Sequence, residues 1–404
     1  MPNTITVRDA AGVAAYGPPA RADVAAAAAR VGADAAAPHA AAVDRDARFP
    51  REAVAAMRDA GLLGAMVPRE LGGLGAPLGD VAAACTALGQ HCASAAMVFA
   101  MHQIQVACLV RHALDTPHFR AFAAELAERQ LLLASATTEA GVGGDVRTSG
   151  CAVTRDGGRF RLEKHAPVIS YGEHADAVLV TARRDPDAPP SDQVLVLARE
   201  GRGGTLALEP TSGWNALGFR GTCSLGFRLT AEGGTEQVVP TPFADVSTHT
   251  MLPVSHVLWS ALWLGIANAA ASKARTFVRA AARRAPGTTP PAALRLAELA
   301  SLHQTMRAGV EHAAFAYERA ADDPEALGAM SFALRMNNLK LASSRQVVDV
   351  VTGALGVCGI AGYREDSPYA LGRHLRDAHG AALMISNDRI HAVNAAMLLV
   401  CKDA

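Results

Sequence analysis

The chain has 404 residues, half of them hydrophobic, and its 38 basic and 38 acidic side chains cancel to a formal net charge of zero. This length predicts two or three domains with a sizeable buried core, and the composition excludes a disordered chain. Because the sequence contains no long run of Lys or Arg, nucleic-acid binding is not expected.

The seven cysteines are scattered, and none has the CxxC or Cys/His spacing of a zinc site. Neither a metal site nor a disulfide framework is expected, and a reducing cytoplasm fits this pattern. Two apolar stretches, 93–110 and 257–270, are predicted to be buried core helices. Polar residues interrupt the first stretch, and the second is too short to span a bilayer.

Taken in chain order, residues 1–22 are predicted to form a flexible tail, and an N-terminal helical domain is expected over 23–133. Ala-rich segments such as 23–35 have high helix propensity. Pro50 lies where the first turn of another helix is expected, with Glu52 beside the positive end of the helix dipole.

The pattern changes after residue 134. Alternating segments on either side of Asp156-Gly157-Gly158 predict a hairpin, and several further short strands follow, separated by Gly, Pro and Asp. A middle β domain, a small antiparallel barrel or sandwich, is therefore expected over 134–245.

Helical periodicity returns in the last part of the chain, and a C-terminal four-helix bundle is predicted over 246–404. Its four expected helical tracts are 255–284, 291–321, 325–356 and 378–400. The predicted fold class is mainly α with a central β domain.

Several short segments in fixed order carry a more specific signal. They are Phe49-Pro-Arg-Glu52, Gly61 to Gly75, Thr138-Glu-Ala-Gly-Val-Gly-Gly-Asp145, Trp214 to Thr222, Arg283 ahead of Gly287, Gly359-Ile-Ala-Gly-Tyr363, and Leu375-Arg-Asp-Ala378. Together they resemble the signatures of the acyl-CoA dehydrogenase family, from about residue 23 to 400. The helix–β–helix order, obtained separately from periodicity, agrees with that family's architecture.

The resemblance implies FAD bound between the β domain and the bundle, in a homodimer or homotetramer whose subunits contact each other's FAD. Thr138 and Ser170 match flavin-contacting hydroxyls, although either hydroxyl also suits a local turn hydrogen bond. Arg283 matches a residue that meets the pyrophosphate of a neighbouring subunit's FAD. The cofactor-binding residues carried over are Thr137, Thr138, Gly143, Gly144, Val168, Ser170, Arg283, Gly359 and Asn387.

The family's catalytic carboxylate, in contrast, has no counterpart in this sequence. The resemblance places it at Ile385, nine residues after Arg376, or in a second branch at Ser255-His256. Val168 also replaces the family's flavin-facing Trp, and Gly144 replaces a loop Ser.

Three functional hypotheses follow. The favoured one is αβ-dehydrogenation of an acyl-CoA or acyl-carrier-protein thioester, with hydride transfer to flavin N5 and an electron-acceptor flavoprotein as partner. The base is then Asp388, which shares a face with Ile385 if this segment is helical, although Asp388 also suits a helix cap or a pair with Arg389.

The second hypothesis is a flavin-dependent monooxygenase supplied with reduced flavin by a reductase. Ser170, His379 and His391 are then the candidates for proton transfer, and His379 also suits a local ion pair with Asp377. The third is a non-catalytic protein that binds flavin or a thioester. The polar residues His102, Gln103 and Gln105 lie on an otherwise apolar helix, either lining a substrate channel or facing solvent.

Overall fold

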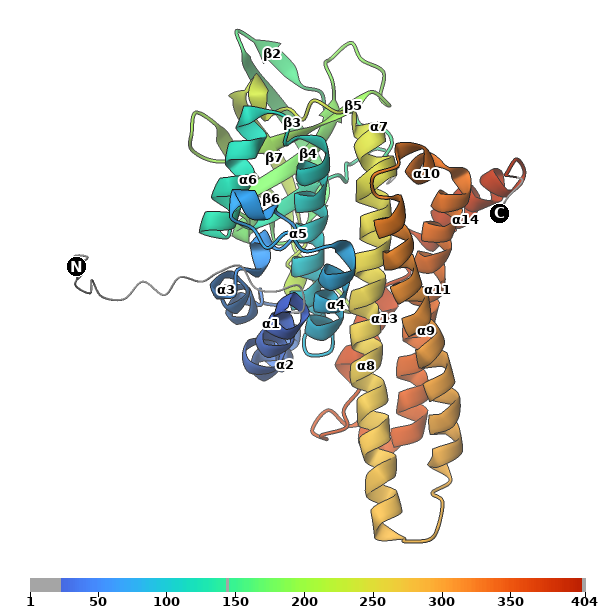
Figure 1. The fold of residues 1–404 in the computed structure, drawn as a ribbon. Coiled ribbons are helices and arrows are strands. Elements are labelled where there is room, and N and C mark those ends of the chain that lie inside the picture. Colours follow the sequence, from blue (N-terminus) through green and yellow to red (C-terminus); the bar gives the residue numbers. More distant parts are fainter. Residues whose placement is uncertain (1–22, 143–144, 402–404) are drawn as a thin grey trace, which may run out of the picture.

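The computed structural model describes residues 23–142 and 145–401. The tail predicted over residues 1–22, together with Gly143 and Gly144, lies outside the described residues. Helices come first, strands follow, and long helices complete the chain (Figure 1). The predicted fold class, mainly helical with a central β domain, is confirmed.

The first part is helical, and its helix α5 is almost wholly buried. Thr116 begins α6 as its cap, because its hydroxyl accepts the N–H of Phe119 while Pro117 occupies the first helical position. The α-helices are α1 (Asp23–Val31), α2 (Ala40–Arg45), α3 (Arg51–Asp59), α4 (Leu78–Gly89), α5 (Ala93–His112) and α6 (Pro117–Arg129). Short 3-10 or π turns are η1 (Gly32–Ala36), η2 (Ala37–His39), η3 (Leu62–Gly64) and η4 (Arg69–Leu71).

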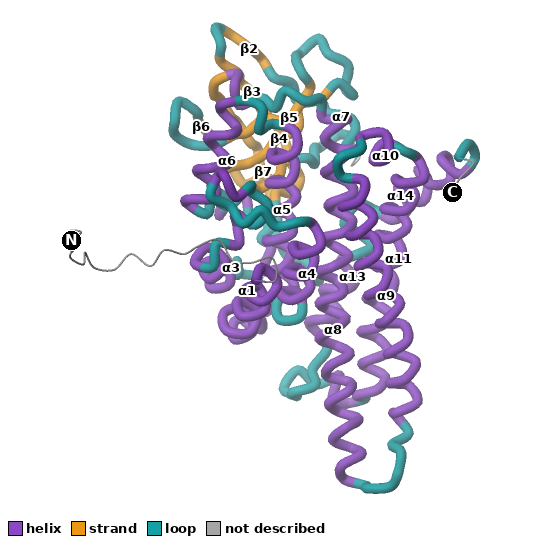
Figure 2. The backbone as a smooth tube through the Cα atoms, viewed as in Figure 1, coloured by secondary structure: helices purple, strands orange, loops and turns teal. Residues whose placement is uncertain are grey.

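The strands form two small sheets at one end of the molecule, drawn in orange in Figure 2. The three-stranded sheet has the order β1 (Leu133–Ala136), β4 (Ala177–Arg183) and β5 (Gln193–Ala198). The four-stranded sheet has the order β2 (Thr154–Asp156), β3 (Arg159–Ile169), β7 (Leu225–Gly234) and β6 (Thr205–Ser212). Side chains alternate between buried and exposed along most of β3, as in a strand with one face on the core.

One strand pair departs from the predicted antiparallel arrangement. β1 and β4 run parallel, whereas the other neighbouring strands run antiparallel. A parallel pair needs a long crossover connection, and here the chain between them includes β2 and β3. The hairpin pattern in the sequence carried no sign of this crossover.

Three long helices run side by side away from the sheets (Figure 1): α8 (Leu252–Arg284), α9 (Ala292–Ala320) and α11 (Met330–Cys358). The fourth tract, predicted over 378–400, is instead two helices, α13 (Gly372–Gly380) and α14 (Asn387–Leu398). Between them Ile385 has a φ of 46°, a left-handed conformation that a β-branched residue rarely adopts and that ends a right-handed helix. The shorter elements are η5 (Gly172–His174), η6 (Arg220–Thr222), η7 (Thr235–Gln237), α7 (Phe243–Val246), η8 (Ser247–Met251), α10 (Pro324–Gly328) and α12 (Ile360–Tyr363).

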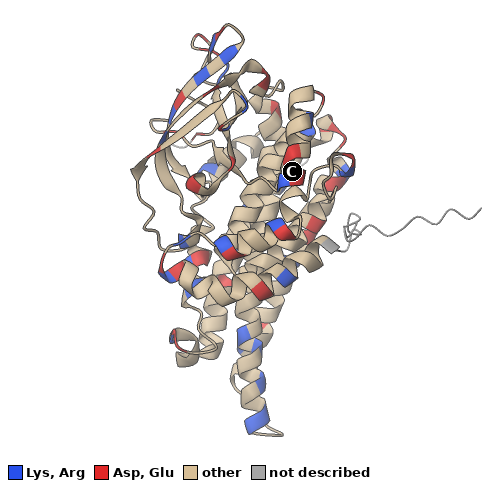
Figure 3. Ribbon diagram, turned by 90° about the vertical axis from the view of Figure 1, so that its left-hand side faces the viewer, with Lys and Arg blue, Asp and Glu red and all other residues tan. Residues whose placement is uncertain are grey.

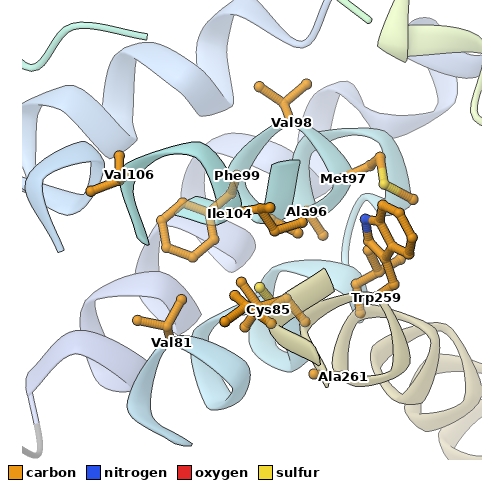
Figure 4. Packing of buried hydrophobic residues seen from close by; sticks show 14 of the residues in the cluster. Val81, Cys85, Ala96, Met97, Val98, Phe99, Ile104, Val106, Trp259 and Ala261 are labelled. Carbon is orange, nitrogen blue, oxygen red and sulfur yellow. The ribbon is translucent and has the colours of Figure 1, made fainter. Parts of the chain in front are cut away.

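The N-terminal helices and the bundle share one core. Figure 4 shows Val81 and Cys85 of α4, Phe99 of α5 and Ala261 of α8 in a single apolar cluster. α4 and α8 approach closely because both carry glycine at the crossing. A Cβ atom on Gly89 would lie 2.5 Å from the carbonyl oxygen of Leu262, so neither backbone has room for a side chain there.

The two apolar stretches lie within this core. The helices Ala93–His112 and Phe243–Arg284 are long and apolar enough to cross a membrane, yet 89% of the most apolar window of each is buried inside the protein. Such burial is that of core helices, as the sequence predicted for 93–110 and 257–270.

Candidate functional site

A cavity of about 470 Å³ lies where the three parts of the chain meet. Its walls are formed by residues next to the ends of the strands, by α5, by the start of α8 and by residues between Arg376 and Ile385. Cavities of this size and mixed lining are typical of sites for small molecules and cofactors.

The strand side of the cavity is rich in hydroxyl groups. Thr137 and Thr138 follow β1, whereas Val168 and Ser170 lie at the end of β3, and all four line the cavity. The two segments are joined directly, because the hydroxyl of Thr138 donates to the carbonyl oxygen of Val168 at 2.8 Å. The structure thus brings together four of the residues that the sequence singled out for cofactor binding.

A buried carboxylate holds the segment that follows β1. Glu139 accepts hydrogen bonds from the Ser149 hydroxyl at 2.6 Å and from the backbone N–H groups of Gly150 and Cys151 at 2.8 and 2.7 Å. Its other neighbour is the fully buried ammonium of Lys164, 3.5 Å away. Burial lowers the pKa of Lys164, so the Glu139 charge is needed to compensate it.

The helix side is mostly apolar. Met97, Met101 and Ile104 line the cavity from one face of α5, at the spacing of successive helical turns. Trp259 of α8 completes this wall, and Figure 4 shows its indole beside Met97. This side presents an apolar surface to the cavity.

Of the three polar positions on α5, Gln105 lines the cavity. His102 and Gln103 face neither a channel nor solvent: Gln103 donates to the carbonyl oxygens of Leu62 and Leu63, at 2.9 and 3.2 Å. The Nδ1 atom of His102 accepts the N–H of Leu133 at 3.0 Å, and its Nε2 contacts the Leu63 carbonyl at 2.8 Å. Burial lowers the pKa of His102 to about 4, so the neutral ring ties α5 to β1.

The third wall contains the motif Leu375-Arg-Asp-Ala378. Arg376 lines the cavity and pairs with Asp44. Asp377 points away and is buried; its carboxylate accepts the N–H of Phe219 at 2.7 Å, and burial raises its pKa to about 6. His379, one turn from Arg376, lies exposed at the edge of the cavity.

Both positions at which the resemblance places a catalytic carboxylate do lie on the cavity, as Ile385 and Ser255. The hydroxyl of Ser255 donates a hydrogen bond to the carbonyl oxygen of Met251, one helical turn earlier in the chain. Among the described residues that line the cavity, no Asp or Glu is present, and Arg376 and His379 are the titratable side chains.

The remaining predicted residues lie elsewhere. Asp388 and His391 are exposed on α14 and do not line the cavity, because the turn at Ile385 breaks the helical face that would have joined Asp388 to it. His391 instead contacts the guanidinium of Arg345 at 2.9 Å. Gly359 ends α11 with a φ of 58°, away from the cavity. Gly143 and Gly144 lie outside the described residues.

Two other predicted cofactor residues also lie off the cavity. Arg283 is exposed in the last turn of α8, at the far end of the long hairpin, where the ribbon in Figure 3 is coloured mainly for basic residues. Asn387 begins α14, and its carboxamide oxygen accepts from the ammonium of Lys340 at 2.7 Å.

Comparison with known proteins gives the same assignment along most of the chain. Residues 19–116 match the acyl-CoA dehydrogenase N-terminal domain, and residues 246–392 match the acyl-CoA dehydrogenase C-terminal domain. L-evernosamine nitrososynthase from a Micromonospora species is 30% identical over 366 residues, covering 87% of this chain and 83% of that protein. The chain belongs to the acyl-CoA dehydrogenase family.

The family includes more than one chemistry. The probable acyl-CoA dehydrogenase FadE25 of Mycobacterium tuberculosis is 27% identical over 373 residues, covering 88% of this chain and 89% of that protein. FMN-bound TdsC from Paenibacillus sp. A11-2 has the same fold, with a TM-score of 0.78, 20% identity, and coverage of 94% of this chain and 97% of that one. Family members are flavin oxidoreductases or oxygenases, so the resemblance predicted from the sequence is confirmed at this level.

A flavin is the cofactor of this family, and the cavity fits one. A flavin requires an apolar slot for its flat ring and hydrogen-bonding groups along its polar edge. The hydroxyls of Thr137, Thr138 and Ser170 supply such groups on the strand side, whereas Met97 and Trp259 supply an apolar surface. When bound, a flavin supplies the redox chemistry that no side chain on these walls provides.

Proposed function

We propose that this protein is a flavin-dependent monooxygenase that uses reduced flavin and molecular oxygen to oxidise a small organic substrate. The observation that carries this proposal is the lack of a carboxylate among the described residues lining the cavity. Removing an α-proton from an acyl thioester needs a base within hydrogen-bond reach, whereas oxygen activation by reduced flavin does not.

Thioester dehydrogenation, the function favoured from the sequence, requires Asp388 to reach the cavity. Asp388 is exposed on α14, outside the cavity wall. The relatives include both the probable acyl-CoA dehydrogenase FadE25 and L-evernosamine nitrososynthase, and the composition of the cavity wall favours oxygen chemistry in this proposal. A purely binding role has no feature of the structure in its favour.

The chain's own residues have defined tasks in this proposal. Met97, Met101 and Trp259 keep water from the cavity, which protects a reactive oxygen species from wasteful breakdown. His379, the imidazole on the cavity wall, exchanges protons between the cavity and solvent, since it is exposed at the edge. The hydroxyls of Thr138 and Ser170 orient the cofactor.

The proposal extends to the cofactor and partners. We expect FAD, with the pyrophosphate held by Arg283 from a neighbouring subunit of a cytoplasmic homodimer or homotetramer, because Arg283 lies exposed far from its own cavity. A flavin reductase is the expected source of electrons. Release of the bound flavin followed by chromatography distinguishes FAD from FMN, and sedimentation gives the oligomeric state.

Two measurements test the proposed function. In the first, the flavin-loaded protein is mixed anaerobically with butyryl-CoA and longer acyl thioesters; we expect no bleaching of the flavin, and bleaching would establish dehydrogenation. In the second, a reductase supplies reduced flavin in air with amino sugars, including L-evernosamine, as substrates, since a relative's name points to this class. Incorporation of ¹⁸O from labelled oxygen supports the proposal.

A further inference from the structure

Two side chains on the helix side of the cavity carry polar atoms without a hydrogen-bond partner. They are the carboxamide oxygen of Gln105 and the indole N–H of Trp259, and neither finds a partner among the described residues. Both side chains are buried, with exposed fractions of 3% and 8%. Buried polar groups are nearly always hydrogen-bonded, because an unpaired one has lost water without a replacement. A molecule bound in the cavity can supply both missing bonds.

The two groups lie at different places along the same wall. Met97, Met101 and Gln105 follow one another at intervals of four residues, so they form one row along α5 that faces the cavity. Trp259 lies beside Met97, at the beginning of this row (Figure 4). Gln105 is two helical turns further on, about 12 Å along the helix axis. The carboxamide and the indole therefore meet different parts of a ligand.

Neighbouring polar groups of the same walls do not share this combination. The hydroxyl of Ser255 also lines the cavity, but it is bonded to its own helix. Trp263, one turn after Trp259, has an indole N–H without a partner among the described residues, but it does not line the cavity. Among the described residues of α5 and α8, Gln105 and Trp259 are those that combine an unpaired buried atom with a place on the cavity wall.

This wall favours neutral polar groups. The residues that α5 and α8 place on the cavity carry no charge, so an ion there would lose its hydration without a counter-charge. The carboxamide oxygen of Gln105 accepts a hydrogen bond from an O–H or a neutral N–H group. The indole N–H of Trp259 only donates, so it requires a lone pair, such as that of a hydroxyl or ether oxygen.

We propose that Gln105 and Trp259 bind the substrate by two hydrogen bonds. The substrate carries a neutral hydroxyl or amino group that donates to Gln105 and, at its other end, an oxygen atom that accepts from Trp259. The hydroxyls on the strand side serve the flavin, so the opposite wall faces the second ligand. The inference rests on the proposed function for the presence of a substrate beside the flavin, and not on the oxidation that follows.

Two small neutral probes test this recognition without turnover. The alcohol trans-4-methoxycyclohexanol has a donor at one end and an acceptor at the other, whereas trans-1,4-dimethoxycyclohexane has acceptors only. Calorimetric titration of the flavin-loaded protein gives their dissociation constants. We expect the wild type to bind the alcohol about tenfold more tightly, the scale of one neutral hydrogen bond. Equal binding of the two probes, or binding of neither, would overturn the proposal.

Substitutions at the two positions should change these constants in different ways. Q105M keeps the length of the side chain but removes the carboxamide, so the preference for the alcohol should disappear. Q105E keeps an acceptor and should retain the preference, which separates the hydrogen bond from packing. W259F removes the indole N–H, so it should weaken both probes by a similar factor, about tenfold, and leave the preference intact.

The matched control is W263F. It removes a buried, unpaired indole N–H from the same helix but off the cavity, so both constants should remain unchanged. If Q105M or W259F weakens binding of the flavin and not of the probes, these groups serve the cofactor and the proposal is overturned. The titrations contain no reductant, so failure of the proposed monooxygenase reaction is seen separately in the oxygen-incorporation assay.

Discussion

The ammonium nitrogen of Lys340 lies 2.6 Å from the carbonyl oxygen of Ile385. Ile385 is on the cavity wall, in the left-handed conformation that ends the α13 segment. A second bond from Lys340 to the carboxamide oxygen of Asn387, at 2.7 Å, fixes the next turn of chain. A fully buried lysine on α11 therefore holds the turn that replaces the expected helix.

Both acceptors of Lys340 are neutral, and burial lowers its pKa to about 8. Between this value and the ordinary pKa near 10.5, the unfolded chain binds more protons than the folded one, so this lysine makes stability rise with pH. We expect K340M to flatten that rise between pH 8 and 10, as measured by urea unfolding.

Lys273 provides the control for that variant. Burial lowers its pKa to about 8 as well, and its ammonium donates to the carbonyl oxygen of Ala370. K273M should therefore flatten the same pH range, but only K340M should increase hydrogen exchange at residues 383–387. Equal exchange in the two variants would mean that Lys340 does not hold the turn.

Asp377 makes stability fall as pH rises, which is opposite to the pH dependence that Lys340 gives. Its pKa, raised to about 6, lies above that of the unfolded chain, so the folded state binds more protons between pH 4 and 6 and loses stability as pH rises through this range. D377N keeps an oxygen for the N–H of Phe219 and removes the charge. At pH 7.5 it is expected to be more stable than the wild type by about 3 kcal/mol.

The comparison must be made at several pH values, because the buried His102 and His256 and the half-buried His112, whose pKa values are lowered to about 4, make acid destabilising over the same range. Both proteins contain these histidines, so their contribution is removed when the free energy of unfolding of the wild type is subtracted from that of D377N. That difference should vanish near pH 4, and a constant difference from pH 4 to 8 would contradict the assignment.

Two substitutions of Glu139, the partner of Lys164, should lower stability by different amounts. E139A leaves the ammonium of Lys164 without its counter-charge and the N–H groups of Gly150 and Cys151 without an acceptor, which should lower the free energy of unfolding by about 3–5 kcal/mol. E139Q keeps an acceptor for these donors and should lose less. Denaturant unfolding gives the energies, and flavin titration should show weaker binding in E139A, since Thr138 adjoins Glu139 in the chain.

The two histidines singled out from the sequence should behave differently. H379A removes the imidazole on the cavity wall and is expected to lower product formed per reduced flavin consumed, by about tenfold or more. H391A changes an exposed residue bonded to Arg345 and should stay within about twofold of the wild type, the scale expected for a surface change. The ratio of product to hydrogen peroxide measures both; a larger loss in H391A would reverse the assignment.

The order of the three parts was predictable because helical and strand periodicities depend on local sequence. The break in the last helix was not, since Ile385 gives no warning of a left-handed conformation that a buried lysine 45 residues away stabilises. The same break explains why Asp388 does not line the cavity beside Ile385, because residues three apart share a face only in a continuous helix.

Site residues next to motifs, such as Thr138, Ser170 and His379, were found from the sequence because the chain carries them into the cavity directly. Trp259 and Lys340 had no such signal. Their importance arises from their places on the cavity wall and beside Ile385, and these exist only after α8 meets α5 and α11 meets the turn before α14.

The glycines at the crossing of α4 and α8 fix the position of a helix that lines the cavity. A Cβ on Gly265 would lie 2.4 Å from the carbonyl oxygen of Thr86, and the hydroxyl of Thr86 donates to Ala261 across the same junction at 2.9 Å. Backbones in direct contact cannot come closer, and the hydrogen bond resists their separation. The position of α8 against the N-terminal helices is thus fixed, and with it the position of Ser255 and Trp259, the residues that α8 places on the cavity wall.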